Sequence, residues 1–214
     1  MPHLVPGPNR VEPLFSPPAR HDELSVLAGA VVRGEDPGAL RTFLATIVPQ
    51  LLRVVRRVLG PAHPDLEDVT YEAAYAVLDG LPRFRGEATV LHFACRVAVL
   101  TAMNVRRREG ANKRAAEASG RSVEQMTSEQ PGPEQGAADA ALAPLVRELV
   151  ATLSEPLAEA LTLHVILGYT VGEISETCGV SSETVRSRLR LAKQALRKRV
   201  LGSPKLREAL EVEP

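Results

Sequence analysis

The stretch from Thr170 to Val200 constrains the fold most, because it is patterned as two short helices around a tight turn. Thr170 and Glu173 have the spacing of a capping box, in which both side chains satisfy backbone N–H groups at a helix start. Gly179 stands where the chain must turn sharply, a conformation that strains other residues. Ser181 then caps a second helix. The stretch predicts a helix-turn-helix.

The second of these helices carries many cations against one acid, Glu183, before Gly202 and Pro204 end it. In this motif the first turns of the second helix enter the major groove, and cations suit DNA phosphates. The candidates for base contacts are Ser182, Glu183, Thr184, Arg186, Ser187 and Arg190, and Lys193 follows among cations expected to contact mainly the backbone. A helical hairpin with a solvated basic face is the weaker alternative.

The remaining charges are segregated, although 26 basic and 26 acidic residues give a formal net charge of zero. One acidic run contains no Lys or Arg: Asp65, Glu67, Asp68, Glu72 and Asp79. From Arg83 to Arg108, six arginines stand against a single acid, Glu87. This distribution predicts more than one kind of partner surface.

Cysteine and histidine usage favours neither a disulfide framework nor a metal site. Cys95 and Cys178 lie far apart in predicted helices, which is typical of reduced thiols in a cytoplasm. His92 and Cys95 have the spacing of two ligands on one helix face, but no second pair completes a zinc site. We expect no metal and no cofactor, and the missing Gly-rich and G-x-S-x-G motifs disfavour an enzyme.

Membrane insertion is also not expected. No run of apolar residues reaches the roughly 18 that span a bilayer. Prolines interrupt the N-terminus where a signal peptide needs an apolar core. The sequence therefore indicates a soluble, cytoplasmic protein.

Helical periodicity predicts an all-α fold in two blocks, without a strand pattern. We expect a flexible tail at 1–20, a first helical domain at 21–109, a flexible linker at 110–138, a second helical domain at 139–203 and a C-terminal tail at 204–214. In the first domain, Pro49 should kink the second helix, the third should start at Asp65, and the fourth should leave through Arg106–Arg108. The linker is rich in Gly, Ser, Gln and Pro.

Two further helices should precede the helix-turn-helix. They are expected at Ala140–Leu153 and Pro156–Leu167, with Ser154 as a cap and Gly168 as a stop.

Five motifs then follow one another in an order typical of one family. They are Asp65-Leu66-Glu67-Asp68-Val69 with Glu72, Phe84-Arg85-Gly86-Glu87, Arg96-Val97-Ala98, Arg106-Arg107-Arg108, and Thr184-Val185-Arg186-Ser187-Arg188-Leu189. In this order they resemble a bacterial sigma factor of the extracytoplasmic-function (ECF) group of the sigma-70 family, from 22 to 202. The resemblance implies a region 2 helical bundle and a region 4 helix-turn-helix, joined by a flexible linker.

The resemblance also implies partners and roles. Core RNA polymerase, through its clamp and flap regions, promoter DNA and an anti-sigma factor are the implied partners. The implied polymerase-binding residues are Asp65, Glu67, Asp68, Val69 and Glu72. Those implied for single-stranded minus-ten DNA are Arg83, Phe84, Arg85, Arg96 and Arg106. The helix-turn-helix residues above would read the minus-thirty-five element as duplex.

A second hypothesis needs no polymerase. The chain would be a stand-alone regulator that binds duplex DNA as a dimer, at half-sites about one helical turn apart. It predicts DNA binding by the free protein, whereas the sigma hypothesis predicts that polymerase is required.

Overall fold

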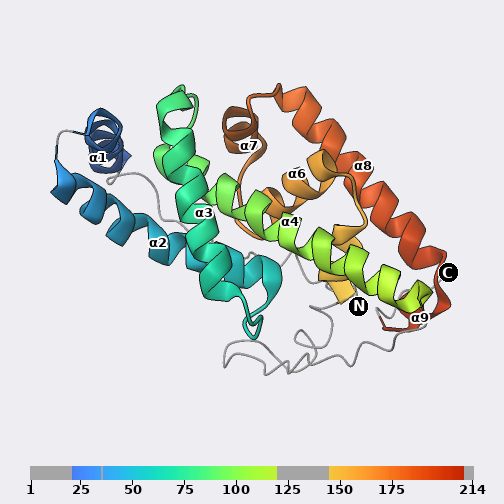
Figure 1. Cartoon of the computed structure of the whole chain (residues 1–214). Coiled ribbons are helices and arrows are strands. Elements are labelled where there is room, and N and C mark those ends of the chain that lie inside the picture. Colours follow the sequence, from blue (N-terminus) through green and yellow to red (C-terminus); the bar gives the residue numbers. More distant parts are fainter. Residues whose placement is uncertain (1–20, 35, 120–144, 210–214) are drawn as a thin grey trace, which may run out of the picture.

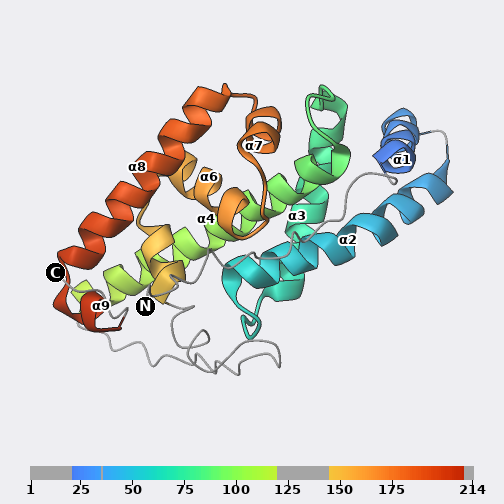
Figure 2. The same ribbon diagram turned by 180° about the vertical axis from the view of Figure 1, so that it is seen from behind.

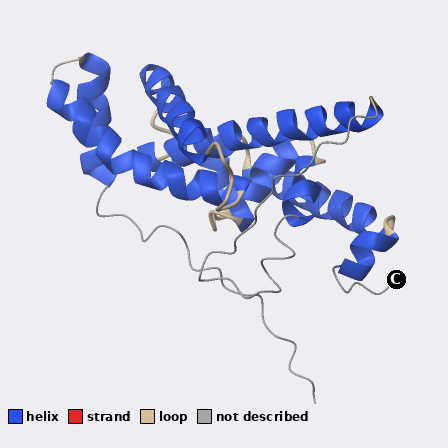
Figure 3. Cartoon of the chain, turned by 60° about the horizontal axis from the view of Figure 1, so that its bottom comes forward, coloured by secondary structure: helices blue, strands red, loops and turns tan. Residues whose placement is uncertain are grey.

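The computed structural model describes residues 21–34, 36–119 and 145–209. These residues form helices joined by short loops, with no strand among them, which confirms the predicted all-α class (Figure 3). The expected N-terminal tail and most of the expected linker lie outside the described residues.

The first block is a bundle around α2 (Pro37–Leu59), which packs on α1 (His21–Arg33), α3 (Leu66–Gly80) and α4 (Val90–Ala118) (Figure 1). The Asp36 side chain caps α2 by accepting from the backbone N–H of Gly38 at 2.7 Å. The helix then continues through Pro49. Its inner face is fully buried at Phe43, Ile47, Leu51, Val54 and Val55.

By length and composition alone, α2 is apolar enough to cross a membrane, with a hydropathy of 1.3. Eight of its residues are buried, and they pack in the centre of the bundle. The interruption by exposed Arg53, Arg56 and Arg57 identifies it as an amphipathic core helix.

Helix α3 begins behind Asp65, as predicted, with Glu67 and Asp68 in its first turn, where acids suit the helix dipole. It ends in a short 3-10 turn, Leu81–Arg83. The loop that follows reaches α4 at Thr89, whose hydroxyl accepts from the His92 backbone N–H at 3.1 Å.

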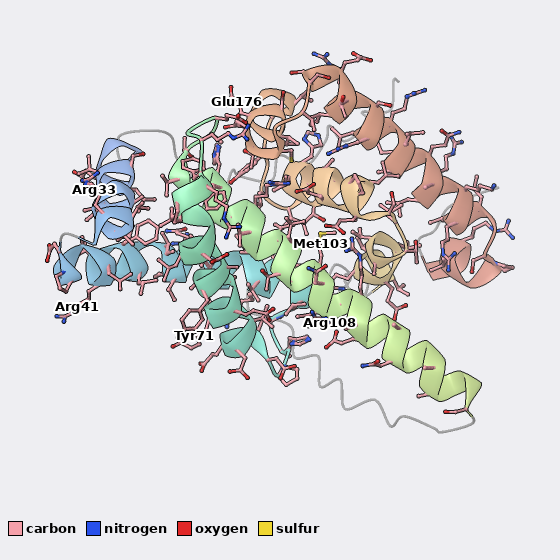
Figure 4. All side chains as sticks on the ribbon, turned by 45° about the horizontal axis from the view of Figure 1, so that its top comes forward. Arg33, Arg41, Tyr71, Met103, Arg108 and Glu176 are labelled. Atoms are coloured by element: carbon pink, nitrogen blue, oxygen red, sulfur yellow. The ribbon has the colours of Figure 1, made fainter. Side chains whose placement is uncertain are left out.

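Helix α4 is longer than predicted. It continues past the arginine cluster to Ala118, so the linker expected from 110 is helical over 110–118 (Figure 4). The apolar period is lost there, but Ala, Glu, Lys and Arg are strong helix formers, which favours continuation of the helix. The sequence-based boundary was therefore wrong by about two turns.

The second block contains a helix at 145–151, α6 (Glu155–Val165), α7 (Val171–Cys178) and α8 (Ser182–Leu201). Helix α6 follows Ser154, and Gly168 (φ 72°) lies in the loop before α7, as expected. A short helix, α9 (Pro204–Ala209), occupies part of the expected C-terminal tail. Ser203 and Pro204 start it, since serine caps helices and proline suits the first helical position.

The two blocks pack on each other. Helix α6 lies between α4 and α8, and α4 contacts both α6 and α7 (Figures 1 and 2). Buried residues of both blocks form one continuous apolar cluster. The second block therefore covers one side of α4 in this structure.

Candidate nucleic-acid and protein-docking surfaces

The helix-turn-helix forms as predicted. The Thr170 backbone N–H donates to Glu173 Oε2 at 2.8 Å, and the Glu173 N–H donates to Thr170 Oγ1 at 3.2 Å, which completes the capping box. Gly179 adopts a left-handed conformation with φ 63°. Ser181 Oγ accepts from the Thr184 N–H at 3.2 Å and starts α8.

Buried residues fix the angle between α7 and α8. Ile174 and Val185 are fully buried between these helices, and Leu189 and Ala192 continue the inner face of α8. The opposite face of α8 is exposed at Glu183, Arg186, Arg190 and Lys193, whereas Ser182, Thr184 and Ser187 are half-buried. The seven predicted DNA contacts thus lie along one helix, with the four charged ones open to solvent.

Helix α3 presents an acidic face. Asp65, Glu67, Asp68 and Glu72 are exposed, but Val69 is only 3% exposed and belongs to the core. Val69 follows the inward period of the helix and packs inside in this structure, so its part in a docking surface stays a prediction.

Two tyrosines on α3 were missed by the sequence reading. Tyr71 is 56% exposed and Tyr75 is 74% exposed, one turn apart and beside Glu72. Figure 4 shows Tyr71 pointing away from the bundle. Large exposed aromatic side chains are typical anchors of protein interfaces. The available signal was the helical period, which places both tyrosines on the polar face.

The five residues predicted for single-stranded DNA lie in two segments, at 83–85 and on α4. Arg83 and Arg85 are exposed, and Arg83 pairs with Asp79 at 3.2 Å. Phe84 is half-buried, with its ring centroid 5.0 Å from that of Phe93. Arg96 and Arg106 lie on α4, where the second block packs.

Arg96 is bound within the protein. Its Nε donates to Glu159 Oε1 at 2.7 Å, and the side chains are 30% and 7% exposed. Burial, the largest single influence, disfavours the charge of Arg96. The Glu159 carboxylate and, less strongly, Cys178 together outweigh burial, so the pKa of the guanidinium is raised. Burial also raises the pKa of the Cys178 thiol to about 11.

Arg106 is half-buried beside a cavity of about 50 Å³ between α2, α4, the helix at 145–151 and α6. Its neighbour Arg107 donates through Nη1 to Glu155 Oε2 at 3.2 Å. Met103 lines the same cavity and faces the second block (Figure 4). Two of the predicted minus-ten arginines are therefore partly covered where the blocks pack.

His63, Asp65 and Glu109 offer ligand atoms within 4.8 Å of one another. The Asp65 backbone N–H points at His63 Nδ1 at 3.2 Å, and His63 Nε2 lies 2.8 Å from Glu109 Oε1. A neutral His63 then carries its proton on Nε2 and donates it to Glu109. A metal at Nε2 would need that proton on Nδ1, opposite the Asp65 N–H. The geometry favours a hydrogen bond over a metal site.

Comparisons with known proteins find similarity to bacterial sigma factors. Residues 144–196 match the family model of sigma-70 region 4. The chain is 28% identical to the ECF RNA polymerase sigma factor ShbA of Streptomyces griseus, over 78% of this chain and 91% of ShbA. It is 28% identical to the ECF RNA polymerase sigma factor SigD of Mycobacterium tuberculosis, over 85% and 86% of the two chains.

A solved structure shares the fold. CnrH, in a structure of its complex with the cytosolic domain of CnrY, superposes with a TM-score of 0.50 at 17% identity, over 83% of this chain and 97% of CnrH. The region 4 match covers the helix-turn-helix, and the relatives extend over both helical blocks. Over both helical blocks, the chain therefore resembles the ECF group of the sigma-70 family of bacterial RNA polymerase sigma factors.

Proposed function

We propose that this sigma factor binds core RNA polymerase, brings it to promoters and promotes melting of the promoter DNA. The observation that carries the proposal is the presence, in one chain, of a basic helix-turn-helix and of an acidic face on a separate block. One surface suits DNA phosphates, and the other suits a basic protein surface.

The exposed face of α8 is proposed to read the minus-thirty-five element in the major groove. Arg186 and Arg190 have the donors that pair with guanine edges, and Ser182, Ser187 and Thr184 offer shorter polar contacts. Lys193 lies further along the helix, where it would contact phosphate. Glu183 would discriminate by accepting from cytosine.

The face of α3 is proposed to dock on the polymerase clamp through Asp65, Glu67, Asp68 and Glu72. Tyr71 and Tyr75 extend this face with apolar area that acids alone lack. The second block would contact the polymerase flap. Such a division requires the blocks at 21–109 and 139–203 to act as separate domains. The expected linker at 110–138, whose first part continues α4 to Ala118 in this structure, would join them, and we retain this division as part of the proposal.

Unpaired minus-ten bases are proposed to bind near the loop at 84–89, with Arg83, Phe84 and Arg85 at its start. Arg96 and Arg106 would join them in the DNA complex. Cations along the backbone and an aromatic ring for an extruded base suit single-stranded DNA. The protein would act in the cytoplasm, without catalysis of its own. An anti-sigma partner would cover the α3 face.

A pull-down with purified bacterial core RNA polymerase tests the docking face. The double charge reversal Glu67→Lys with Asp68→Lys should abolish binding, because both side chains are exposed on that face. The matched control, Glu23→Lys with Glu176→Lys, reverses the same number of exposed charges elsewhere and should bind like the native chain. Failure of the native chain to bind polymerase, combined with a shift of duplex DNA, would favour the stand-alone regulator.

A further inference from the structure

The loop proposed to hold minus-ten DNA lies against the turn of the helix-turn-helix. A Cβ placed on Gly179 would lie 3.5 Å from Glu87 Oε2, which belongs to the loop after Phe84. The two promoter elements are named for positions about 25 base pairs apart, which is roughly 85 Å of B-DNA at about 3.4 Å per pair. Both elements cannot be bound by the two blocks while those blocks are in contact.

The contact between the blocks is built from specific polar interactions. Arg96 and the buried Glu159 form one ion pair. About three turns further along α4, Arg107 pairs with Glu155, which is 57% exposed and lies one turn before Glu159 on α6. Arg57 of α2 donates through Nη1 to the Ile166 carbonyl at 3.1 Å. Each interaction joins an arginine of the first block to an acceptor of the second.

Tyr169 adds an apolar and aromatic part to the same contact. It is buried, and its ring centroid lies 4.3 Å from that of His92 on α4. Its hydroxyl is buried and makes no hydrogen bond among the described residues. The second block thus places a side chain against α4 one helical turn from Arg96.

Glu159 requires a positively charged partner from the other block. A carboxylate that is 7% exposed is costly to bury unless it is paired, and Arg96 is its partner. Separation of the two blocks would expose both side chains to water, and Arg96 could then bind a DNA phosphate. The same arginine therefore serves either Glu159 or DNA.

We infer that this structure is a closed resting state of the sigma factor, in which the Arg96–Glu159 ion pair holds the second block over the DNA-facing side of α4. This inference rests on the proposed function, because the words resting and DNA-facing assume that the protein binds polymerase and promoter DNA. The closed state withholds Arg96 and Arg106 from single-stranded DNA and prevents the two blocks from spanning a promoter. Binding of the blocks to separate sites on polymerase is what opens it.

The first test measures closure of the free, full-length protein by small-angle X-ray scattering. Glu159→Gln removes the charge, leaves Arg96 without its ionic partner and should raise the radius of gyration by about one fifth, the change expected when a compact chain becomes two tethered domains. Glu176→Gln removes one exposed charge from the neighbouring α7 and should leave the radius unchanged. A compact Glu159→Gln protein with native helicity would overturn the inference.

A charge swap tests the pair itself. Glu159→Arg should open the protein by repulsion from Arg96, and the added change Arg96→Glu should restore the compact radius. Expansion that the second change does not reverse would show that position 159 acts through something other than Arg96. If Glu159→Gln loses helicity, the radius of gyration of Glu155→Gln is measured instead. This variant weakens the same contact between the blocks at a residue that is exposed. An unchanged radius would then overturn the inference.

Affinity for core polymerase separates this inference from the proposed function. Because closure lowers the fraction of competent protein, Glu159→Gln should bind core polymerase roughly five- to tenfold more tightly than the native chain. Equal affinity of an expanded Glu159→Gln protein and the native chain would contradict the resting-state role. If neither protein binds polymerase while Glu159→Gln still expands, the ion pair holds the blocks together and the proposed function fails.

Discussion

Helices α4 and α8 are both rich in arginine, yet they use that charge in opposite ways. The cations of α8 at Arg186 and Arg190 are exposed along a face that no other described element covers. On α4, Arg96 is held by Glu159 and Arg106 is half-buried beside a cavity. Sequence charge shows where cations are, whereas packing decides which of them a ligand can reach.

The largest expected effect concerns the core that positions α8. Ile174→Ala should lower the free energy of unfolding by about 2–5 kcal/mol, because Ile174 is fully buried between α7 and α8. Leu191→Ala, at an exposed position of α8, should change it by less than about 0.5 kcal/mol. Urea denaturation followed by circular dichroism measures both, and similar losses would mean that α8 is not held by this core.

Two Arg–Glu pairs test the comparison directly. Glu159→Ala leaves Arg96 partly buried without its partner and should cost about 2–3 kcal/mol, below the full value for a buried pair because Arg96 is 30% exposed. Glu183→Ala removes the partner of Arg186 in a pair that is 64% and 84% exposed, and should cost under about 0.5 kcal/mol. Thermal unfolding of the two variants should rank them in this order, and the reverse order would show that burial does not separate the two helices.

The DNA-facing side of α8 should divide into base and phosphate contacts. With polymerase present, Arg190→Ala should weaken promoter binding by about 1–3 kcal/mol and relax preference at one base pair. Lys193→Ala should weaken all sequences alike and reduce the slope of log affinity against log salt by about 1. Binding titrations at several salt concentrations measure both, and identical behaviour of the two variants would remove the distinction.

The smallest expected effect is local to the turn. Thr170→Ala removes the hydroxyl of the capping box and should destabilise the second block by about 1 kcal/mol. Thr46→Ala on α2 removes an exposed hydroxyl that accepts no helix-start N–H, and should cost less. Denaturation midpoints compare the two, and equal costs would mean that the box adds nothing to the motif.

Local sequence signals predicted the helices well. The capping box at Thr170, the turn at Gly179 and the cap at Ser181 involve residues at most three positions apart, so their chemistry can be read along the chain. The same holds for the acidic first turn of α3. Helix ends without such signals were less certain, as the extension of α4 to Ala118 shows.

The candidate sites were predicted less completely, because they depend on contacts between distant residues. Glu159 is 63 positions from Arg96, and nothing near either residue announces the pair. As long as this ion pair was unknown, only the family resemblance gave Arg96 a role, which was to contact DNA. The burial of Val69 and the exposure of Tyr71, in contrast, follow from local sequence. The helical period alone assigns Val69 to the core and Tyr71 to the surface.

Selection of genomic DNA fragments tests the central claim most directly. Fragments are captured on the tagged full-length protein with and without core RNA polymerase, and then sequenced. The sigma-factor account predicts enrichment only when polymerase is present, with two short motifs at one fixed spacing. Enrichment of a single palindromic site by the protein alone, unchanged by polymerase, would contradict it.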